Sequence, residues 1–365
     1  APALPHLETV PRPGLCRGAL RPSRGRSAGR MRAAGVWALA LCGAVRTGRC
    51  LRLEASSAPA GDGPVPASIV AFERPLRRGA GRGSEYLPEP GLAELYLSTL
   101  RDTLTGSALK TPGVSPGRQG AVQVTPFEDA ERDEGRGWCD FCYTMAGNAR
   151  LSHVRRLLER CAAEAVPGDF VEAGVWRGGT SIFARAVQRA AGEGAARRVY
   201  ACDSFAGVPR ASAGPDSDWF HGEAFLAVPL EEVRDHFERF QMLDQNVVFV
   251  RGYFQDSLPL LRERLRGEGR SVAVLRGDGD LHESYYDILY NLYDLVPVGG
   301  YFVCDDCPNV LLAHAAVHQF RARHGIAEPM EPVPGSSSGM FWRKARQVSV
   351  DYAYYLQWNE TRRRG

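Results

Sequence analysis

The sequence predicts an α/β protein with a doubly wound, mostly parallel sheet that carries helices on both faces. Three observations indicate this fold class. From Trp138 onward, short apolar segments alternate with amphipathic segments of helical period, a glycine-rich turn follows the first apolar segment, and acidic residues follow several others. Such alternation is typical of right-handed βαβ units. Sheets of this kind bind ligands at the carboxyl ends of their strands, so we expect the functional site there.

The individual elements follow from apolar periodicity. The short apolar runs predicted as strands are residues 170–173, 199–202, 247–250, 272–275 and 301–304. The amphipathic segments predicted as helices are residues 148–164, 178–191, 230–240, 257–266, 283–295 and 310–323. Upstream, residues 92–104 have apolar side chains three and four apart, which predicts a short docked helix.

Composition suggests one folded domain behind a long leader. The 365 residues are 44% hydrophobic and 24% charged, which excludes a wholly disordered or fibrous chain. Residues 1–120 are biased toward Pro, Gly and Arg, and we expect a largely disordered leader and low-complexity linker. Residues 121–346 are expected to form the domain. Residues 347–365 are interpreted as a C-terminal tail whose arginines, Arg362 to Arg364, are a solvated end.

The first methionine is Met31, and the apolar stretch 33–45 follows it. These 13 residues are too short to span a bilayer but suit the apolar core of a signal peptide. An Ala-rich leader and an organelle transit sequence remain alternatives. No other segment approaches membrane length, so we expect a soluble mature protein with no membrane span, in a compartment that the sequence leaves open.

Charge is distributed unevenly along the chain. Residues 1–60 hold ten Arg against Glu8 and Glu54 and carry +8, so the remainder of a chain with total charge +3 carries −5. A mildly acidic folded part argues against a nucleic-acid platform.

The first chemical signal is the turn 172–179, Glu-Ala-Gly-Val-Trp-Arg-Gly-Gly, after the first predicted strand. Its glycines would let a ligand approach the backbone, and Asp203, after the next strand, could bind ribose hydroxyls. A packing turn with a surface Asp is the alternative, because the spacing does not match a strict dinucleotide fingerprint. The carboxylate of Glu172 would repel a pyrophosphate, which favours S-adenosylmethionine over NAD.

The second signal is acidic. Asp278 and Asp280 follow one predicted strand, and Asp305 and Asp306 follow the next. Ends of adjacent parallel strands lie about 5 Å apart, so Asp278, Asp305 and Asp306 can converge on a cation. Oxygen ligands favour Mg²⁺ over zinc, with Ca²⁺ or Mn²⁺ as alternatives. Helix capping by one or two of these Asp residues is the alternative. Asp280 and His282 are the candidate bases beside the metal.

Several motifs in order resemble the macrocin O-methyltransferase family, over about residues 137–344. The segments that carry the resemblance are 143–151, 167–180, 202–209, 252–259, 275–284, 299–306 and 341–344. The resemblance implies the seven-stranded, Rossmann-like fold of class I methyltransferases, S-adenosylmethionine as methyl donor and a hydroxyl of a sugar or other polyol-bearing small molecule as acceptor.

The resemblance also implies roles for single residues. Asp278, Asp305 and Asp306 would bind Mg²⁺, and Asp280 would be the general base, with His282 as an assistant. The residues expected around the cofactor are Thr144, Met145, Glu172, Gly174, Asp203, Ser204 and Asp256. Three positions depart from the family pattern and touch the acceptor side, namely Gly277, His282 and Cys307.

Other interpretations stay open at this level. The segment 278–280, Asp-Gly-Asp, also fits a metal-dependent glycosyltransferase, and a catalytically silent methyltransferase-like module would keep the same fold. Two CxxC pairs, 139–142 and 304–307, are too far apart for a zinc ribbon, and the sequence does not say which cysteines pair. It also leaves open the identity of the acceptor and whether the chain forms a homo-oligomer.

Overall fold

The computed structural model describes residues 91–116, 122–210 and 223–364. The expected signal peptide and most of the expected leader lie outside these residues. None of the helices within the described ranges is both long and apolar enough to cross a membrane.

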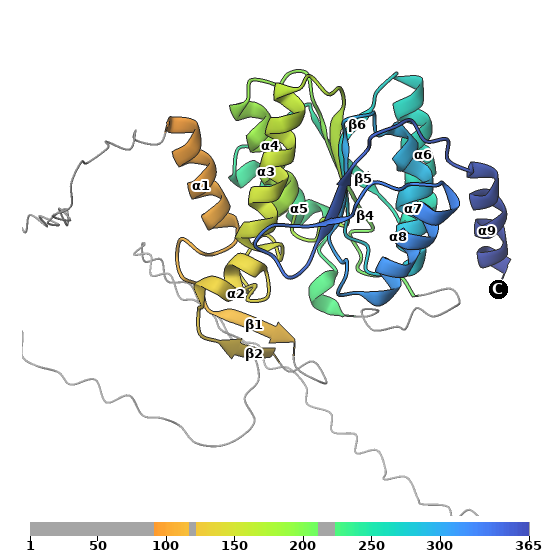
Figure 1. Cartoon of the computed structure of the whole chain (residues 1–365). Coiled ribbons are helices and arrows are strands. Elements are labelled where there is room, and N and C mark those ends of the chain that lie inside the picture. Colours follow the sequence, from red (N-terminus) through yellow and green to blue (C-terminus); the bar gives the residue numbers. More distant parts are fainter. Residues whose placement is uncertain (1–90, 117–121, 211–222, 365) are drawn as a thin grey trace, which may run out of the picture. The chain divides into compact units, whose positions relative to one another are not determined.

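A seven-stranded sheet in the order β5-β4-β3-β6-β7-β9-β8 forms the centre of the fold (Figure 1). Its strands are β3 (Asp169–Ala173), β4 (Val199–Asp203), β5 (Val247–Arg251), β6 (Val272–Gly277), β7 (Tyr301–Cys304), β8 (Glu331–Pro332) and β9 (Met340–Arg343). Strands β3 to β7 pair in parallel, whereas β9 pairs antiparallel with both β7 and β8. The prediction of a mostly parallel seven-stranded sheet is confirmed.

Helices cover both faces of the sheet, as the continuous apolar runs of its central parallel strands require. On one face, α3 (Gly147–Ala163), α4 (Gly179–Ala190) and α5 (Leu230–Arg239) pack over Phe170 and Val274. On the other, α6 (Phe254–Gly267), α7 (His282–Leu292) and α8 (Leu311–Arg323) pack over Val171 and Leu275. Short 3-10 turns, η2 (Ala224–Leu226) and η3 (Tyr293–Leu295), precede α5 and follow α7.

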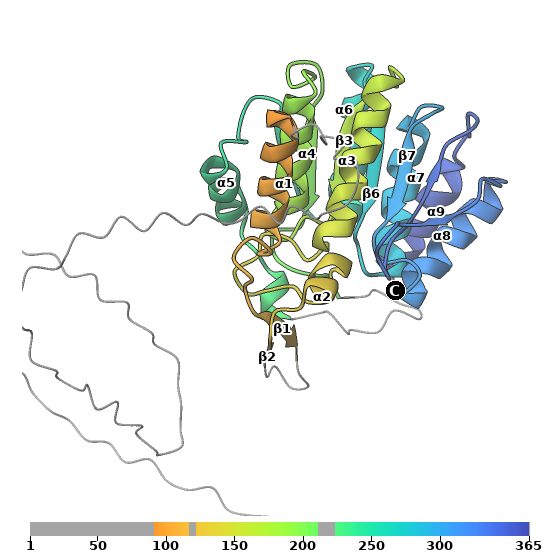
Figure 2. The same ribbon diagram turned by 60° about the vertical axis from the view of Figure 1, so that its left-hand side comes forward.

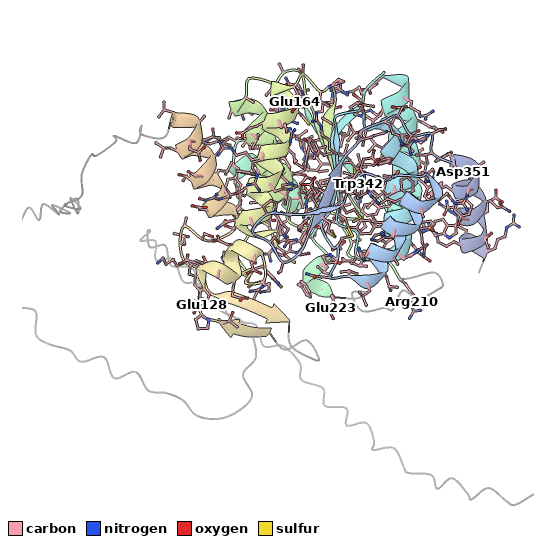
Figure 3. The ribbon with its side chains drawn as sticks, in the orientation of Figure 1. Glu128, Glu164, Arg210, Glu223, Trp342 and Asp351 are labelled. Carbon is pink, nitrogen blue, oxygen red and sulfur yellow. A yellow bond between two sulfur atoms is a disulfide. The ribbon has the colours of Figure 1, made fainter. Side chains whose placement is uncertain are left out.

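The antiparallel edge is fixed by an aromatic anchor. Trp342 of β9 is fully buried (Figure 3), with its ring centroid 4.6 Å from that of Phe302. Its indole Nε1 donates a hydrogen bond of 2.9 Å to the Tyr293 hydroxyl, so the one polar atom of this ring is satisfied.

The packed body begins earlier than the sequence suggested. Helix α1 (Leu92–Leu104) lies beside α3 and α4 (Figure 2) and buries Leu97, Leu100 and Leu104. A hairpin of β1 (Gly113–Pro116) and β2 (Val122–Thr125) and the short helix α2 (Asp129–Glu134) follow it. The predicted helix at 92–104 is therefore confirmed, and the predicted domain boundary at residue 121 is wrong because α1 belongs to the same core.

The C-terminal tail also differs from expectation. Residues Tyr352–Arg364 form helix α9, whose Tyr355 is fully buried. Arg363 and Arg364 are exposed, but Arg362 is only 8% exposed. The expectation that all three arginines form a solvated end is wrong for Arg362, because the buried Asp287 and the partly buried Glu283 of α7 bind its guanidinium.

Candidate active site

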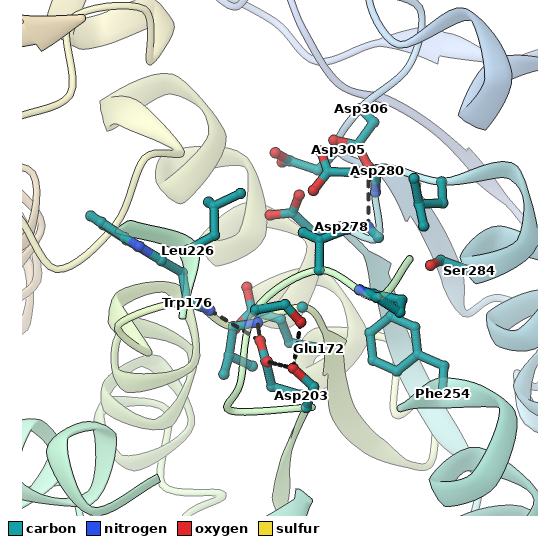
Figure 4. A pocket seen from close by; sticks show the side chains of 18 of the residues that line it. Glu172, Trp176, Asp203, Leu226, Phe254, Asp278, Asp280, Ser284, Asp305 and Asp306 are labelled. Carbon is teal, nitrogen blue, oxygen red and sulfur yellow. Dashed lines mark hydrogen bonds between the residues drawn. The ribbon is translucent and has the colours of Figure 1, made fainter. Parts of the chain in front are cut away.

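A pocket of about 370 Å³ opens at the carboxyl ends of β3, β4, β6 and β7 (Figure 4), where ligands bind in sheets of this kind. Its lining includes most of the residues singled out from the sequence. Those are Thr144, Met145, Glu172, Gly174, Asp203, Ser204, Asp278, Asp280, Asp305 and Asp306.

The glycine-rich turn closes tightly against the neighbouring loop. Gly174 has φ +93°, and a Cβ at this position would lie 1.7 Å from the backbone oxygen of Asp278, so no other residue fits. The Asp203 carboxylate accepts hydrogen bonds from the backbone N–H groups of Val175 (2.9 Å) and Phe205 (2.8 Å). Burial raises the pKa of Asp203. Asp203 thus holds the turn in place and also lines the pocket.

Three residues near the strand ends have left-handed backbones, Trp176 (φ 47°), Phe205 (φ 54°) and Asp280 (φ 59°). Each lies in a loop at the carboxyl edge of the sheet. Non-glycine residues in this region store strain of about 1–3 kcal/mol each, and they cluster at functional sites.

The pocket floor is an ion network around Arg276. This guanidinium, 2% exposed, lies 2.6 Å from Glu172 Oε1, 2.9 Å from Asp278 Oδ2 and 2.5 Å from Asp305 Oδ1. The Ser181 hydroxyl donates to Glu172 Oε2. Burial raises the pKa of Glu172 to about 7, although Arg276 opposes the shift.

Arg150 connects this network to the segment 144–146. Its guanidinium pairs with Asp305 and donates to the backbone oxygens of Met145 (2.8 Å) and Ala146 (2.7 Å). Burial would raise the pKa of Asp305, but Arg150 and Arg276 together hold it below its ordinary value. Thr144 completes the segment, with its hydroxyl 3.1 Å from that of Thr180.

Asp306 organises the loop that carries Asp280. Its Oδ2 accepts hydrogen bonds from the backbone N–H groups of Gly279 (3.1 Å) and Asp280 (2.9 Å), and it lies 2.8 Å from the Tyr285 hydroxyl. The alternative of helix capping does not describe this side chain, because its hydrogen bonds go to the loop before α7, and neither α7 nor α8 has a side-chain cap.

The Asp280 carboxylate faces the pocket with none of the described residues donating a hydrogen bond to it. Burial raises its pKa to about 7, and the charge of Asp278 adds to the shift. A carboxylate with a pKa near neutrality and without a donor is suited to accept a proton from a ligand.

Within the described ranges, no three His, Cys, Asp or Glu side chains are arranged to hold a metal ion. The reason is visible in the ion pairs: Asp305 is turned toward Arg150 and Arg276. The chemistry and charge of the residues nevertheless fit a hard cation. Five carboxylates (Glu172, Asp278, Asp280, Asp305 and Asp306) line one floor, and the guanidinium groups of Arg150 and Arg276 form ion pairs with three of them, Glu172, Asp278 and Asp305.

Two predicted site residues lie away from the pocket. Asp256 is exposed on the first turn of α6, and its carboxylate pairs with Arg363. His282, the first residue of α7, has Nε2 3.0 Å from Gln319 Oε1 and its ring 4.6 Å from that of Tyr286. Neither belongs to the pocket lining, so the geometry does not support a cofactor role for Asp256 or a catalytic role for His282.

Other lining residues were not assigned roles from the sequence. They include Arg150, Trp176, Arg276, Ser284, Asp287 and Arg362. Arg276 could have been found, because an arginine two residues before Asp278 on a buried strand needs acidic partners. Arg362 carried no such signal, since a terminal run of three arginines is ordinarily solvated.

Both CxxC pairs are disulfides that flank the pocket. Cys139–Cys142 follows the pocket residue Trp138, and Cys304–Cys307 encloses Asp305 and Asp306. The sequence had left the pairing open.

The sheet order and the carboxylate-lined pocket define a class I S-adenosylmethionine-dependent O-methyltransferase, and comparisons with known proteins agree. Residues 94–344 match the family described as Macrocin-O-methyltransferase (TylF), and the chain belongs to this family. This membership decides against the glycosyltransferase and silent-module alternatives.

Two curated relatives and one solved structure illustrate the likeness. The 8-demethyl-8-(2,3-dimethoxy-alpha-L-rhamnosyl)-tetracenomycin-C 4'-O-methyltransferase of Streptomyces olivaceus is 40% identical over 262 residues, which cover 68% of this chain and 92% of that protein. The demethyldecarbamoylnovobiocin O-methyltransferase of Streptomyces niveus is 36% identical over 259 residues, covering 70% and 95%. The structure of the O-methyltransferase NovP superposes with a TM-score of 0.60 at 35% identity, covering 70% of this chain and 100% of that one.

Proposed function

We propose that this enzyme transfers the methyl group of S-adenosylmethionine to a hydroxyl of a sugar ring on a small glycoside, with Asp280 as general base. The observation that carries the proposal is the Asp280 carboxylate, which faces the pocket and receives no hydrogen bond from a described residue. The acceptor class is supported by the relatives, one of which is named for methylation of a rhamnosyl group.

In the proposed reaction, the acceptor oxygen attacks the methyl carbon in line with the departing sulfur. An alcohol is a poor nucleophile near neutral pH, so Asp280 would accept its proton as the new bond forms. The turn 174–176, fixed by Asp203, and the segment 144–146, fixed by Arg150, would hold the donor while the acceptor is aligned.

We further propose that Asp278, Asp305 and Asp306 hold Mg²⁺. The carboxylate excess of the pocket floor and the hard oxygen donors support this ion. When bound, it would stabilise the alkoxide character of the acceptor oxygen.

The test is methyl transfer from labelled S-adenosylmethionine to a panel of nitrophenyl glycosides, with product mass as the readout. Asp280→Asn should lower kcat by about 10²-fold or more without weakening S-adenosylhomocysteine binding. Asp235→Asn, an exposed carboxylate on α5, is the matched control. Transfer at the wild-type rate by Asp280→Asn would contradict the role of this base.

The metal is tested separately in the same assay. Treatment with EDTA should abolish transfer, and added Mg²⁺ should restore it. A rate of methyl transfer that EDTA does not change would show that the enzyme does not need a metal ion at these carboxylates.

A further inference from the structure

Helix α9 lies outside the segment that matches the family, yet it reaches the pocket. The match ends at residue 344, and α9 spans Tyr352–Arg364. Arg362 is one of the pocket-lining residues, and it is 8% exposed. A terminal extension therefore contributes to a wall of the active site.

The guanidinium of Arg362 is held in one geometry. It forms two parallel contacts of 3.1 Å with the carboxylate oxygens of Asp287, which also accepts a 2.8 Å hydrogen bond from the Tyr355 hydroxyl. Asn359 Oδ1 accepts a further hydrogen bond of 2.8 Å, and the guanidinium lies 4.6 Å from the ring centroid of Trp358. Bidentate pairs of this kind are strong and directional.

These contacts tie α9 to the helix that follows the proposed base. Asp287 belongs to α7, whose first turn also places Glu283 and Ser284 in the pocket lining. Helix α7 begins two residues after Asp280. Because Glu283 and Ser284 line the same pocket as Asp280, an acceptor whose hydroxyl reaches Asp280 can contact the first turn of α7.

A second contact ties α9 to α6. Arg363 pairs with the Asp256 carboxylate and donates to the Gln255 backbone oxygen (3.1 Å) in the first turn of α6. Phe254 and Gln255 of this turn line the same pocket. Helix α9 thus contacts the first turn of α6 and, through Glu283 and Asp287, the first two turns of α7, and both helices border the site.

We propose that α9 is a brace for the acceptor-binding wall, and that Arg362 is a positioning residue that fixes α7 against the acceptor. The inference rests on the proposed function, because it assumes that the acceptor lies beside Asp280. Arg362 acts here through Asp287 and does not bind an anionic acceptor, since its charge is balanced by Asp287 and by Glu283 at 3.6 Å.

The test compares Arg362→Met with Arg364→Met in the full chain. Arg364 lies on the same helix with its side chain 80% exposed, and its partner is Glu360 on α9 itself. For the glycoside that accepts the label, Arg362→Met should raise KM at least about tenfold and change kcat and the Kd of S-adenosylhomocysteine less than about threefold. Arg364→Met should behave as wild type.

A double variant separates positioning from folding. Arg362→Met leaves the buried Asp287 unpaired, whereas Asp287→Asn/Arg362→Met removes both charges and should recover much of the lost stability. If Arg362 positions α7 for the acceptor, the double variant should keep the raised KM even though its stability recovers. A wild-type KM in the double variant, or an equal loss of S-adenosylhomocysteine binding, would overturn the inference. A KM that rises only for carboxylate-bearing acceptors would instead show that Arg362 binds an anion.

Hydrogen exchange provides a readout that does not depend on the acceptor. In the double variant, amides of residues 254–257 and 282–287 should exchange faster than in wild type, and those of α3 and α4 should not change. If no glycoside accepts label but this exchange pattern appears, the proposed function fails and the acceptor role of the wall fails with it, while the exchange shows only that α9 holds α6 and α7 in place. If wild type methylates a glycoside and exchange is unchanged, the brace alone fails.

Discussion

Replacing Arg276 by Met should destabilise the fold more than any surface charge change. The guanidinium is 2% exposed and lies within 2.9 Å of carboxylate oxygens of Glu172, Asp278 and Asp305. Methionine fits the aliphatic part of the cavity but leaves these carboxylates without their shared cation. Breaking a buried ion pair from one side costs about 3–5 kcal/mol, so we expect the free energy of unfolding to fall by that amount.

Urea unfolding followed by circular dichroism measures this loss at pH 7. The matched control is Arg155→Met, because Arg155 also pairs with two glutamates, Glu94 and Glu159, but at the surface of α3. That variant should lose less than about 1 kcal/mol. Equal losses in the two variants would refute the claim that the Arg276 network is a buried electrostatic centre.

Three further predictions concern stability. Burial lowers the pKa of His153 to about 4. As the pH falls below 6.5, this histidine therefore binds a proton in the unfolded chain but not in the folded chain. Between pH 7 and pH 5 the free energy of unfolding should fall by about 2 kcal/mol because of this group. His153→Phe should remove that part of the pH dependence in urea titrations, and an unchanged dependence would show that the histidine is not the cause. Gly174→Ala should destabilise the fold and weaken S-adenosylhomocysteine binding more than Gly192→Ala does. Both glycines have a left-handed φ, but only at Gly174 does a backbone oxygen occupy the position that a Cβ would take. Equal effects of the two substitutions in calorimetry would mean that the backbone conformation, and not this close contact, determines the loss. Leu104→Ala, at a fully buried site, should lower the free energy of unfolding by about 2–5 kcal/mol. Leu92→Ala, at a site that is 87% exposed, should lower it by less than about 0.5 kcal/mol. Similar melting temperatures for the two variants would mean that α1 is not part of the core.

The parallel core was predictable because β3, β4, β6 and β7 are buried on both faces and therefore read as short apolar runs, and the partly buried edge strand β5 has the same apolar composition. The predicted range 272–275 lies within β6 (Val272–Gly277), and 301–304 coincides with β7. The two-residue strand β8 has too few residues for any periodicity to appear. Helix α9 was missed for a different reason: its apolar and charged residues do not separate into two faces, because it packs through aromatic rings and ion pairs.

Site residues were predictable where a motif follows a strand. Asp278, Asp280, Asp305 and Asp306 all reach one pocket because adjacent parallel strands end at one edge. The sequence motifs do not determine the direction in which a side chain points. His282 begins α7 and turns toward Gln319 of α8 because helical geometry carries it away from the loop that holds Asp280.

The most direct test of the account is a crystal structure of the enzyme with S-adenosylhomocysteine bound. We expect the ligand between the turn 174–176 and the loop 278–280, with its sulfur facing the space in front of the Asp280 carboxylate. A ligand bound elsewhere, or an Asp280 side chain directed away from that sulfur, would contradict it.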